Sequence, residues 1–294
     1  MYKIVEISSK YEIEQLGTKE KFWVKDEEEG IKQLFKIGRD NTGENWAEKV
    51  ACEIASLLGL PHAHYELAKY KDKMGTLSNS FIGEDERLVH GNELMIKVVN
   101  SDYPIDQFYK VRDYKVETVL SLVKKMEKHF KIQNSVRDFI GYIVFDCLIA
   151  NQDRHHENWG YIIDSNQKLR LAPTYDHAAG LGCRVSVDEA TKRLKTNDAN
   201  YTVEAFCKRA RTPFYVKGSS RLSTLEACRV AARFDSDVFC FWVDKISTIK
   251  ADELKAIFKQ IPSEYIEEGI RIFGQEVIEV NSKRLVALKE EFCK

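Results

Sequence analysis

A dense group of polar side chains occupies residues 151–182, which read NQDRHHENWGYIIDSNQKLRLAPTYDHAAGLG. Asp153 lies five residues before Asn158, and Asp176 follows near the end of the stretch. Carboxylate and amide oxygens suit Mg²⁺, which completes its shell with water and phosphate oxygens. In phosphoryl transfer an aspartate accepts the proton of the substrate hydroxyl, while an asparagine and a second aspartate hold the metal ions. The spacing therefore predicts Asp153 as a base and Asn158 and Asp176 as metal ligands.

A hairpin is expected to bring the two metal ligands together. Residues 159–164 and 169–174 alternate as strands do, and the turn 165–168 joins them. Symmetric pairing about this turn would place Asn158 opposite Tyr175. Asp176 would then lie within one residue of Asn158 across the ladder, where neighbouring strands are about 5 Å apart.

Simpler interpretations exist for each of these residues. Asp153 and Arg154 could form a surface ion pair, and Asn158 and Asp176 could each stabilise a turn. The combination of spacing and hairpin favours the chemical interpretation. Three histidines lie in the same stretch, but the neighbouring oxygens are hard ligands, so we expect these histidines to order the loop: His155, His156 and His177.

The elements that must position these residues fall into two regions. The first hundred residues alternate short strand-like runs with one amphipathic helix at 45–58, which Gly59 and Pro61 should end. From about residue 112 the periodicity is helical. We therefore predict an α+β fold with a small, mixed, β-rich N-lobe at 1–110 and a mainly helical C-lobe at 111–294.

Composition limits the class of protein. The 294 residues are 44% hydrophobic and carry a net charge of -1, so no global field attracts nucleic acid or an anionic membrane. The seven cysteines form no CxxC pair and most of them lie in apolar runs, which indicates reduced thiols and disfavours a structural zinc site. The most apolar segment, 139–150, is interrupted by Asp146 and is too short to span a bilayer. We expect a cytoplasmic protein, with a secreted or translocated effector left open.

Four stretches resemble the HipA-like serine/threonine kinases. N-x-D-R-H-x-x-N-x-G followed by YD resembles their catalytic and metal-binding segments. EQLGTKEKFWV followed by LFKIG resembles their phosphate-loop strand pair and nucleotide lysine. GENWAEKVACEIASLLGLPHA resembles their small-lobe helix, and GTLSNSFI resembles the strand that leads into the adenine-binding hinge. The resemblance runs from about residue 10 to the end of the chain.

The resemblance implies a two-lobed, protein-kinase-like fold that uses ATP and Mg²⁺. It implies Asp153 as the catalytic base and Asn158 and Asp176 as the magnesium ligands. The nucleotide-binding residues that it implies are Lys36, Gly17, Thr18, Glu48 and Phe81. Lys25 lies in a similar run and competes with Lys36. Glu53 competes with Glu48 as the partner of that lysine, because a helical wheel places Glu48 on the far side of the helix from the apolar face.

The function expected from these residues is transfer of the ATP γ-phosphate to a serine or threonine hydroxyl of a protein. The resemblance allows a toxin or effector with an antitoxin-type partner. A phosphoinositide-type lipid kinase is the alternative, and a non-catalytic, pseudokinase-like binding module is another. The stretch after Asp176 has little periodicity and suggests an activation or substrate segment. Its basic run at 208–221, with Phe214 and Tyr215, leaves direct contact with nucleic acid or an acidic substrate open.

Overall fold

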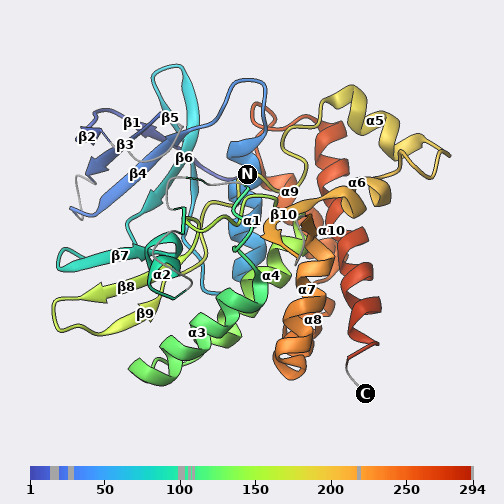
Figure 1. The fold of residues 1–294 in the computed structure, drawn as a ribbon. Coiled ribbons are helices and arrows are strands. Elements are labelled where there is room, and N and C mark those ends of the chain that lie inside the picture. The colour runs from blue at the N-terminus through green and yellow to red at the C-terminus, as the bar shows by residue number, and fades with distance from the viewer. Residues whose placement is uncertain are drawn as a thin grey trace.

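The computed structural model describes residues 1–13, 20–25, 30–98, 103–104, 107, 110–216 and 220–292. The strands are β1 (Ile4–Ile7), β2 (Glu12–Ile13), β3 (Lys21–Lys25), β4 (Lys32–Ile37), β5 (Glu66–Tyr70), β6 (Lys73–Asn79), β7 (Glu86–His90), β8 (Gly160–Asp164), β9 (Leu169–Leu171), β10 (Arg211–Tyr215) and β11 (Arg221–Ser223). The helices are α1 (Glu44–Leu58), α2 (Gly91–Val98), α3 (Val116–Phe130), α4 (Ser135–Leu148), α5 (Val187–Lys195), α6 (Val203–Arg209), α7 (Thr224–Phe234), α8 (Ser236–Ser247), α9 (Ala251–Gln260) and α10 (Glu268–Lys289). Figure 1 shows most strands on one side of the molecule and most helices on the other.

A six-stranded sheet forms most of the N-terminal region. Its strand order is β1-β5-β6-β4-β3-β2, with β1 parallel to β5 and the other pairs antiparallel. Phe35 on β4 is fully buried and packs against Phe22 of β3, with the rings tilted to each other and their centroids 5.1 Å apart. Successive side chains of a strand point to opposite faces. Lys36 therefore leaves the sheet on the face opposite Phe35.

The β1–β5 edge of this sheet is tied to the C-terminal helices. The backbone N–H of Tyr2 donates to Gln260 O over 2.7 Å, and the hydroxyl of Tyr265 donates to Ala68 O over 3.0 Å. After β6 the chain leaves the six-stranded sheet and forms β7, which belongs to a different sheet. The expected domain boundary near residue 110 stays a prediction.

A second sheet has the order β7-β8-β9, so the predicted hairpin gains a third strand from the N-terminal region. Its register differs by one residue from the prediction, because Tyr161 pairs with Leu171. Continued to the loop, this register would place Asn158 opposite Thr174 instead of Tyr175. The second strand of the hairpin, β9, also ends earlier than expected, because Thr174 forms a bridge with His62 instead. The N–H of Thr174 donates to Pro61 O over 2.9 Å.

The helical region is built around α4. This helix is apolar on nearly every side and buried over most of its length, and it packs against α3, α7, α8 and α10. A helix that is apolar all round belongs in a core. α1 begins at Glu44, one residue before the predicted start, and ends at Leu58 with Gly59 in the left-handed conformation. Among the described residues, no helix combines the length and apolarity needed to cross a membrane.

The cysteines follow the expectation in part. Five of them are buried free thiols: Cys52, Cys147, Cys183, Cys207 and Cys228. Cys240 is disulfide-bonded, so the expectation of an entirely reduced chain is wrong at that position.

A substitution of Gly160 tests the β7–β8 pairing next to residues 151–158. A Cβ added there would lie 2.3 Å from the backbone oxygen of Val89, which cannot move without disturbing the β7–β8 ladder. We expect Gly160→Ala to lower the free energy of unfolding by about 1–3 kcal/mol in urea denaturation. Gly269→Ala is the control, because its Cβ would meet nothing closer than 3.4 Å at the start of α10. Equal stability of the two variants would show that the ladder tolerates the change.

Candidate active site

The predicted catalytic loop begins where α4 ends. The side-chain amide of Asn151 donates to Asp146 Oδ1 over 2.7 Å, and its backbone N–H donates to Asp146 O over 2.8 Å. Ala150, between the helix end and Asn151, has a φ of 52°, which turns the chain sharply. The N–H of Leu181 donates to Ile149 O over 2.6 Å. The first residue of the loop is therefore fixed to the most buried helix of the protein.

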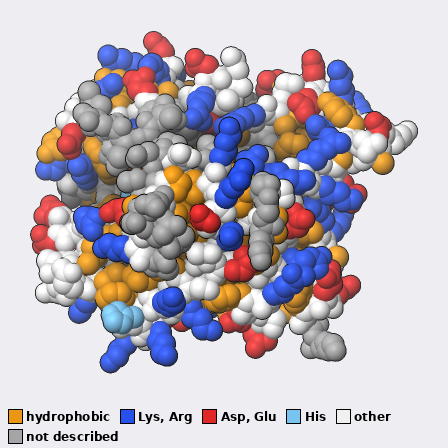
Figure 2. All heavy atoms as spheres, in the orientation of Figure 1, with side chains coloured by type: hydrophobic (Ala, Val, Ile, Leu, Met, Phe, Trp, Pro, Cys, Tyr) orange, Lys and Arg blue, Asp and Glu red, His pale blue; other side chains and the backbone are white. Residues whose placement is uncertain are grey.

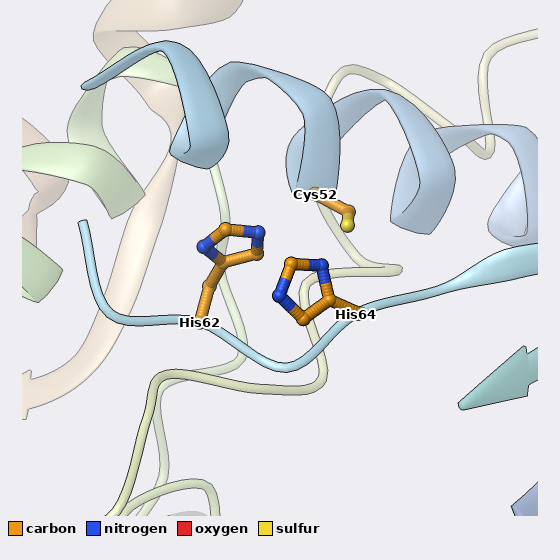
Figure 3. Close-up of side chains that lie close together, drawn as sticks. All are labelled: Cys52, His62 and His64. Atoms are coloured by element: carbon orange, nitrogen blue, oxygen red, sulfur yellow. The ribbon is translucent and has the colours of Figure 1, made fainter. Parts of the chain in front are cut away.

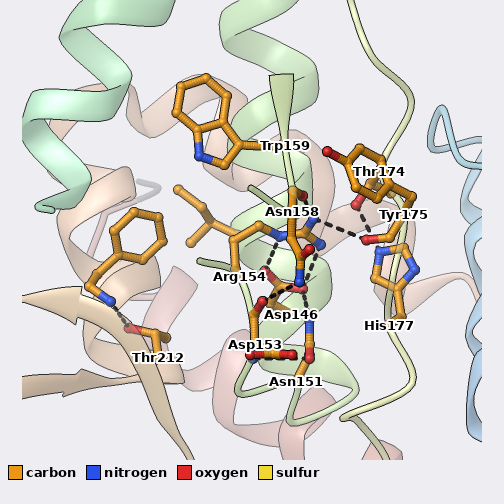
Figure 4. Close-up of polar contacts among 12 residues, drawn as sticks. Asp146, Asn151, Asp153, Arg154, Asn158, Trp159, Thr174, Tyr175, His177 and Thr212 are labelled. Carbon is orange, nitrogen blue, oxygen red and sulfur yellow. Dashed lines mark hydrogen bonds and ion pairs between the residues drawn. The ribbon is translucent and has the colours of Figure 1, made fainter. Parts of the chain in front are cut away.

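Arg154 is the buried centre of this loop. Its side chain is 1% exposed and forms two hydrogen bonds to Asp146, from Nε to Oδ2 over 2.8 Å and from Nη2 to Oδ1 over 2.9 Å. Nη1 donates to Asn158 O over 2.6 Å and lies 3.5 Å from Tyr175 O (Figure 4). One guanidinium thus joins α4 to both segments that carry predicted metal ligands. The alternative of a surface pair between Asp153 and Arg154 is wrong.

Asp153 and Asn158 are oriented within the same loop. The N–H of Asp153 donates to Asn151 Oδ1 over 3.2 Å. Its carbonyl oxygen accepts from the amide of Asn158 over 2.7 Å. Because that bond uses the NH₂ group of Asn158, the Oδ1 atom lies at the opposite end of the amide, where it can act as a ligand. The Asp153 side chain is partly exposed, with its carboxylate 4.0 Å from Nε2 of His155.

Lys36 and Asp176 meet although the sequence separates them widely. Lys36 Nζ lies 3.6 Å from Asp176 Oδ1. Burial alone would lower the pKa of Lys36, but Asp176 and Glu48 together hold this pKa above its ordinary value. Lys36 is therefore charged at neutral pH. Lys25, the competing lysine, is exposed and pairs in register with Lys32 at the far end of β3.

Asp176 has an unusual backbone conformation. Its φ is 60°, a region that few residues other than glycine adopt. The Asp176 N–H donates to the hydroxyl of Tyr65 over 3.3 Å, which helps to hold this conformation. Strained conformations of this kind are found at functional sites where the surrounding contacts fix them.

Glu48 fixes the residues that follow Asp176. Its carboxylate is buried and accepts from the N–H groups of His177 over 2.7 Å and Ala178 over 3.2 Å. The helical wheel misplaced Glu48, because α1 is buried on nearly every side. Glu53, the alternative, pairs with Lys49 at 2.7 Å. Glu48 supports the charge of Lys36 electrostatically, and its hydrogen bonds go to the Asp176 loop.

The predicted metal ligands fit a hard divalent cation. Asn158 offers an amide oxygen, and Asp176 offers a carboxylate that is 30% exposed. Burial lowers the pKa of His155, and the negative charges of Asp153 and Asp176 oppose this shift. Both carboxylates therefore act on one imidazole. Mg²⁺ would be held by Asn158 and Asp176, beside Asp153 and Lys36.

The predicted adenine end of the site is described in part. Phe81 lies between β6 and β7, stacked on Tyr175 with ring centroids 5.4 Å apart. The hydroxyl of Tyr175 donates to Glu157 O over 2.6 Å, which links this stack to the catalytic loop. Gly17 and Thr18, predicted to contact the nucleotide, lie outside the described residues.

The histidines have structural contacts, as expected. His177 Nε2 lies 2.8 Å from Thr174 Oγ1, and His156 Nδ1 lies 2.8 Å from the hydroxyl of Tyr103. His155 Nδ1 accepts from the N–H of Glu157 over 3.2 Å. The three rings therefore order the loops that surround the carboxylates.

The segment after Asp176 is more regular than the sequence suggested, because α5, α6, β10 and β11 occupy much of it. Figure 2 shows Lys and Arg side chains gathered over this side of the molecule, with acidic side chains among them. Lys208 pairs with Glu204 at 2.7 Å. Phe214 and Tyr215 are buried, so these aromatic rings cannot stack on nucleic-acid bases. Lys217 lies outside the described residues.

Sequence reasoning missed the buried support of the site. Asp146 was noted only as an interruption of an apolar segment, and Arg154 only as a surface group. A signal was present, because a charged residue in a buried helix needs a partner of opposite charge. Tyr114, whose hydroxyl donates to Arg154 O over 2.9 Å and accepts from Trp159 Nε1 over 2.9 Å, was also missed.

Sequence comparisons identify relatives of the chain. The family model described as HipA-like C-terminal domain matches residues 14–237. The serine/threonine-protein kinase CtkA of Helicobacter pylori strain J99 is 29% identical over 133 residues, which are 45% of this chain and 38% of CtkA. The matched region thus spans well under half of that relative's length.

Solved structures share the fold. The crystal structure of the Helicobacter pylori proinflammatory kinase CtkA matches with a TM-score of 0.75 and 18% identity, and covers 98% of each chain. A chain in the complex of HipA, HipB and operator DNA from Shewanella oneidensis MR-1 matches with a TM-score of 0.61 and 11% identity. That match covers 97% of this chain and 68% of the other. These likenesses confirm the predicted α+β, kinase-like fold.

The Asp146–Arg154 pair should control stability. Asp146→Asn would leave the Arg154 guanidinium buried without a carboxylate, so we expect a loss of about 3–5 kcal/mol in the free energy of unfolding. Asp244→Asn is the matched control, because Asp244 pairs with Lys289 at the exposed surface, and its loss should be under about 1 kcal/mol. Urea denaturation of both variants would measure the difference. Equal losses would contradict a structural role for the buried pair.

His156 should make stability depend on pH. Burial, with smaller contributions from His155 and His90, lowers its pKa to about 4. The unfolded imidazole titrates near pH 6.5, so between these values the unfolded chain binds more protons. Stability should therefore fall by up to about 3 kcal/mol as the pH decreases from about 6.5 to 4.

His156→Gln should reduce this loss, whereas the exposed His129→Gln should keep it. Urea midpoints measured between neutral pH and pH 5 would compare the variants. Parallel curves for wild type and His156→Gln would show that His156 stays unprotonated in both states or protonates equally in both.

Proposed function

Because the chain belongs to the family of HipA-like C-terminal domains, we propose that it is an ATP-dependent serine/threonine protein kinase. The observation that carries this proposal is the ion pair of Lys36 with Asp176, beside a catalytic loop that Arg154 holds in place. A lysine, a metal-binding carboxylate and a nearby aspartate base are the groups that phosphoryl transfer requires. The kinase relative CtkA supports the same reaction class.

The phosphates of the nucleotide would lie beside Lys36 and the metal ligands. Lys36 would contact its phosphates, with Gly17, Thr18 and Glu48 as further members of the nucleotide site. Phe81 would lie beside the adenine, at the start of the link between the two sheets. Mg²⁺, held by Asn158 and Asp176, would neutralise the negative charge of the phosphates. Lys36 remains charged in this setting, which favours binding of an anion.

Asp153 would act on the acceptor. Its carboxylate is partly exposed, so a serine or threonine hydroxyl of a protein substrate can reach it. The carboxylate would orient the hydroxyl for in-line attack and accept its proton as the bond to phosphorus forms. Because Asn151 and Asn158 both hold the backbone of Asp153, its side chain approaches the acceptor from a fixed position.

The observations favour a protein acceptor over a lipid. A membrane-facing basic and aromatic surface at 208–221 would have supported the lipid-kinase alternative, but its aromatic residues Phe214 and Tyr215 are buried. A non-catalytic binding module can be distinguished from a kinase only by a measurement of phosphate transfer. An antitoxin-type partner and a toxin or effector role are supported only by the fold shared with HipA. These roles and a cytoplasmic location stay predictions.

Three substitutions test the site. We expect Asp153→Asn to lower the rate of phosphate transfer at least about 100-fold, because it removes the base. Asp176→Asn should abolish transfer by removing a metal ligand. Lys36→Met should weaken binding of MgATP, whereas Lys25→Met, at the exposed end of β3, should not. Transfer from γ-radiolabelled ATP to casein, histone and the chain itself measures activity, and calorimetry measures nucleotide binding.

Several results would contradict the proposal. Labelling by Asp153→Asn and Asp176→Asn equal to that of the wild type would exclude these residues from catalysis. Nucleotide binding by the wild type without transfer to any acceptor would favour the binding module. Equal effects of Lys25→Met and Lys36→Met would remove the assignment of the nucleotide lysine.

A further inference from the structure

Three side chains with metal-binding atoms converge outside the catalytic site. Cys52 on α1 and His62 and His64 on the segment before β5 bring their sulfur and imidazole nitrogens within 4.8 Å of one another. Figure 3 shows the thiol on the underside of α1, with the two rings below it on one stretch of chain. Cys52 is buried, His62 is half-buried and His64 is exposed. The cluster therefore has a closed side at the helix and an open side toward solvent.

The local backbone explains why the two histidines share one side. They are separated by Ala63 in a segment that makes a bridge with Thr174. In extended chain, alternate side chains point to the same face. The two imidazole centroids lie 4.7 Å apart. The pattern His-Ala-His thus places two nitrogens in front of a helix that carries one cysteine.

The hydrogen bonds around His62 prepare it to bind a metal. Its Nδ1 lies 2.7 Å from Leu60 O, and burial lowers the pKa of this ring. A neutral ring can donate to this carbonyl only from Nδ1–H, which leaves the lone pair on Nε2. Histidine ligands of metals are commonly fixed by such a bond from the other ring nitrogen.

The present partner of Nε2 can be displaced. Ser56 Oγ lies 3.0 Å from His62 Nε2, but the same hydroxyl lies 3.1 Å from Cys52 O. A hydroxyl has one proton, so it can donate to the carbonyl when a metal occupies Nε2. Cys52 Sγ accepts from the N–H of Tyr65 over 3.4 Å, a contact that would also stabilise a thiolate.

We propose that Cys52, His62 and His64 form a Zn²⁺ site with one coordination position open to water. A thiolate with two imidazoles matches the preference of zinc, and three protein ligands plus water complete a tetrahedron. Tetrahedral zinc requires ligand atoms about 3.3–3.6 Å apart. The present spacing needs a closure of about 1 Å, which the exposed side chain of His64 can supply. Mg²⁺ does not suit these soft ligands.

Binding replaces a proton with the metal. Burial raises the pKa of Cys52 to about 11, so the group is a thiol before zinc binds. The zinc–sulfur bond forms as the S–H bond breaks, and the proton leaves to solvent.

The site would brace the loop that carries Asp176. Ala63 N–H donates to Thr174 O over 2.9 Å, and Tyr65 accepts from the N–H of Asp176. Glu48, one turn before Cys52 on α1, holds the two N–H groups after Asp176. Zinc would join α1 directly to the segment 62–64. Its expected effect on the folded chain is a higher melting temperature.

Cobalt substitution tests the proposal without any measurement of activity. The metal-free chain is titrated with Co²⁺, and a thiolate-to-cobalt charge-transfer band should saturate at one equivalent and disappear when Zn²⁺ is added. Cys52→Ser should lose this band, and His64→Ala should weaken zinc binding by more than about tenfold. His129→Ala, at another exposed histidine, should bind as the wild type does. Because His64 is exposed, His64→Ala is expected to fold, and circular dichroism checks each variant.

Two results would overturn the site. One is the absence of a saturable band in the wild type. The other is zinc affinity unchanged by both Cys52→Ser and His64→Ala. Cobalt bound at Asn158 and Asp176 would give no thiolate band, so a failure here is separate from a failure of the kinase proposal.

Discussion

The burial of Arg154 is the constraint on which the candidate active site depends. A guanidinium removed from water must have a charged partner and acceptors for its N–H groups, and Asp146, Asn158 O and Tyr175 O provide them. Each of these groups comes from a different element. The need to satisfy one buried cation therefore fixes the end of α4, the catalytic loop and the segment before Asp176 in a single arrangement. The functional side chains, which are more exposed, gain their positions from it.

A second connection comes from α1. Glu48 has its carboxylate bound to two backbone N–H groups beyond Asp176, while its charge also acts on Lys36. Two carboxylates facing one ammonium leave an excess of negative charge near the lysine. A divalent cation with a nucleotide would change this balance, and the fixed backbone donors to Glu48 prevent the carboxylate from following it. The helix α1 therefore fixes the segment after Asp176 through hydrogen bonds that form without any ligand.

Local patterns in the sequence were sufficient for part of this arrangement. The spacing of Asp153 and Asn158, the hairpin and the boundaries of α1 depend on neighbours along the chain, and they could be predicted. The hairpin register was wrong by one residue because Thr174 pairs with His62, a contact between distant segments. The burial of Glu48 and Arg154 depends on packing from every side, which periodicity does not record. A search for CxxC also does not find the convergence of Cys52 with His62 and His64, because these residues lie on separate elements.

The hydrogen bonds of the β1–β5 edge have a consequence for motion. The hydrogen bonds of Tyr2 and Tyr265 attach this edge to the C-terminal helices. On the other side, Arg170 of β9 donates to the carbonyl oxygen of Phe81 over 3.1 Å. A rigid rotation of the whole sheet would break bonds at both places. The β3–β2 edge is the opposite edge of this sheet. A molecule bound beside this sheet would therefore exchange through local movements of individual strands, and the sheet would not need to move as one body.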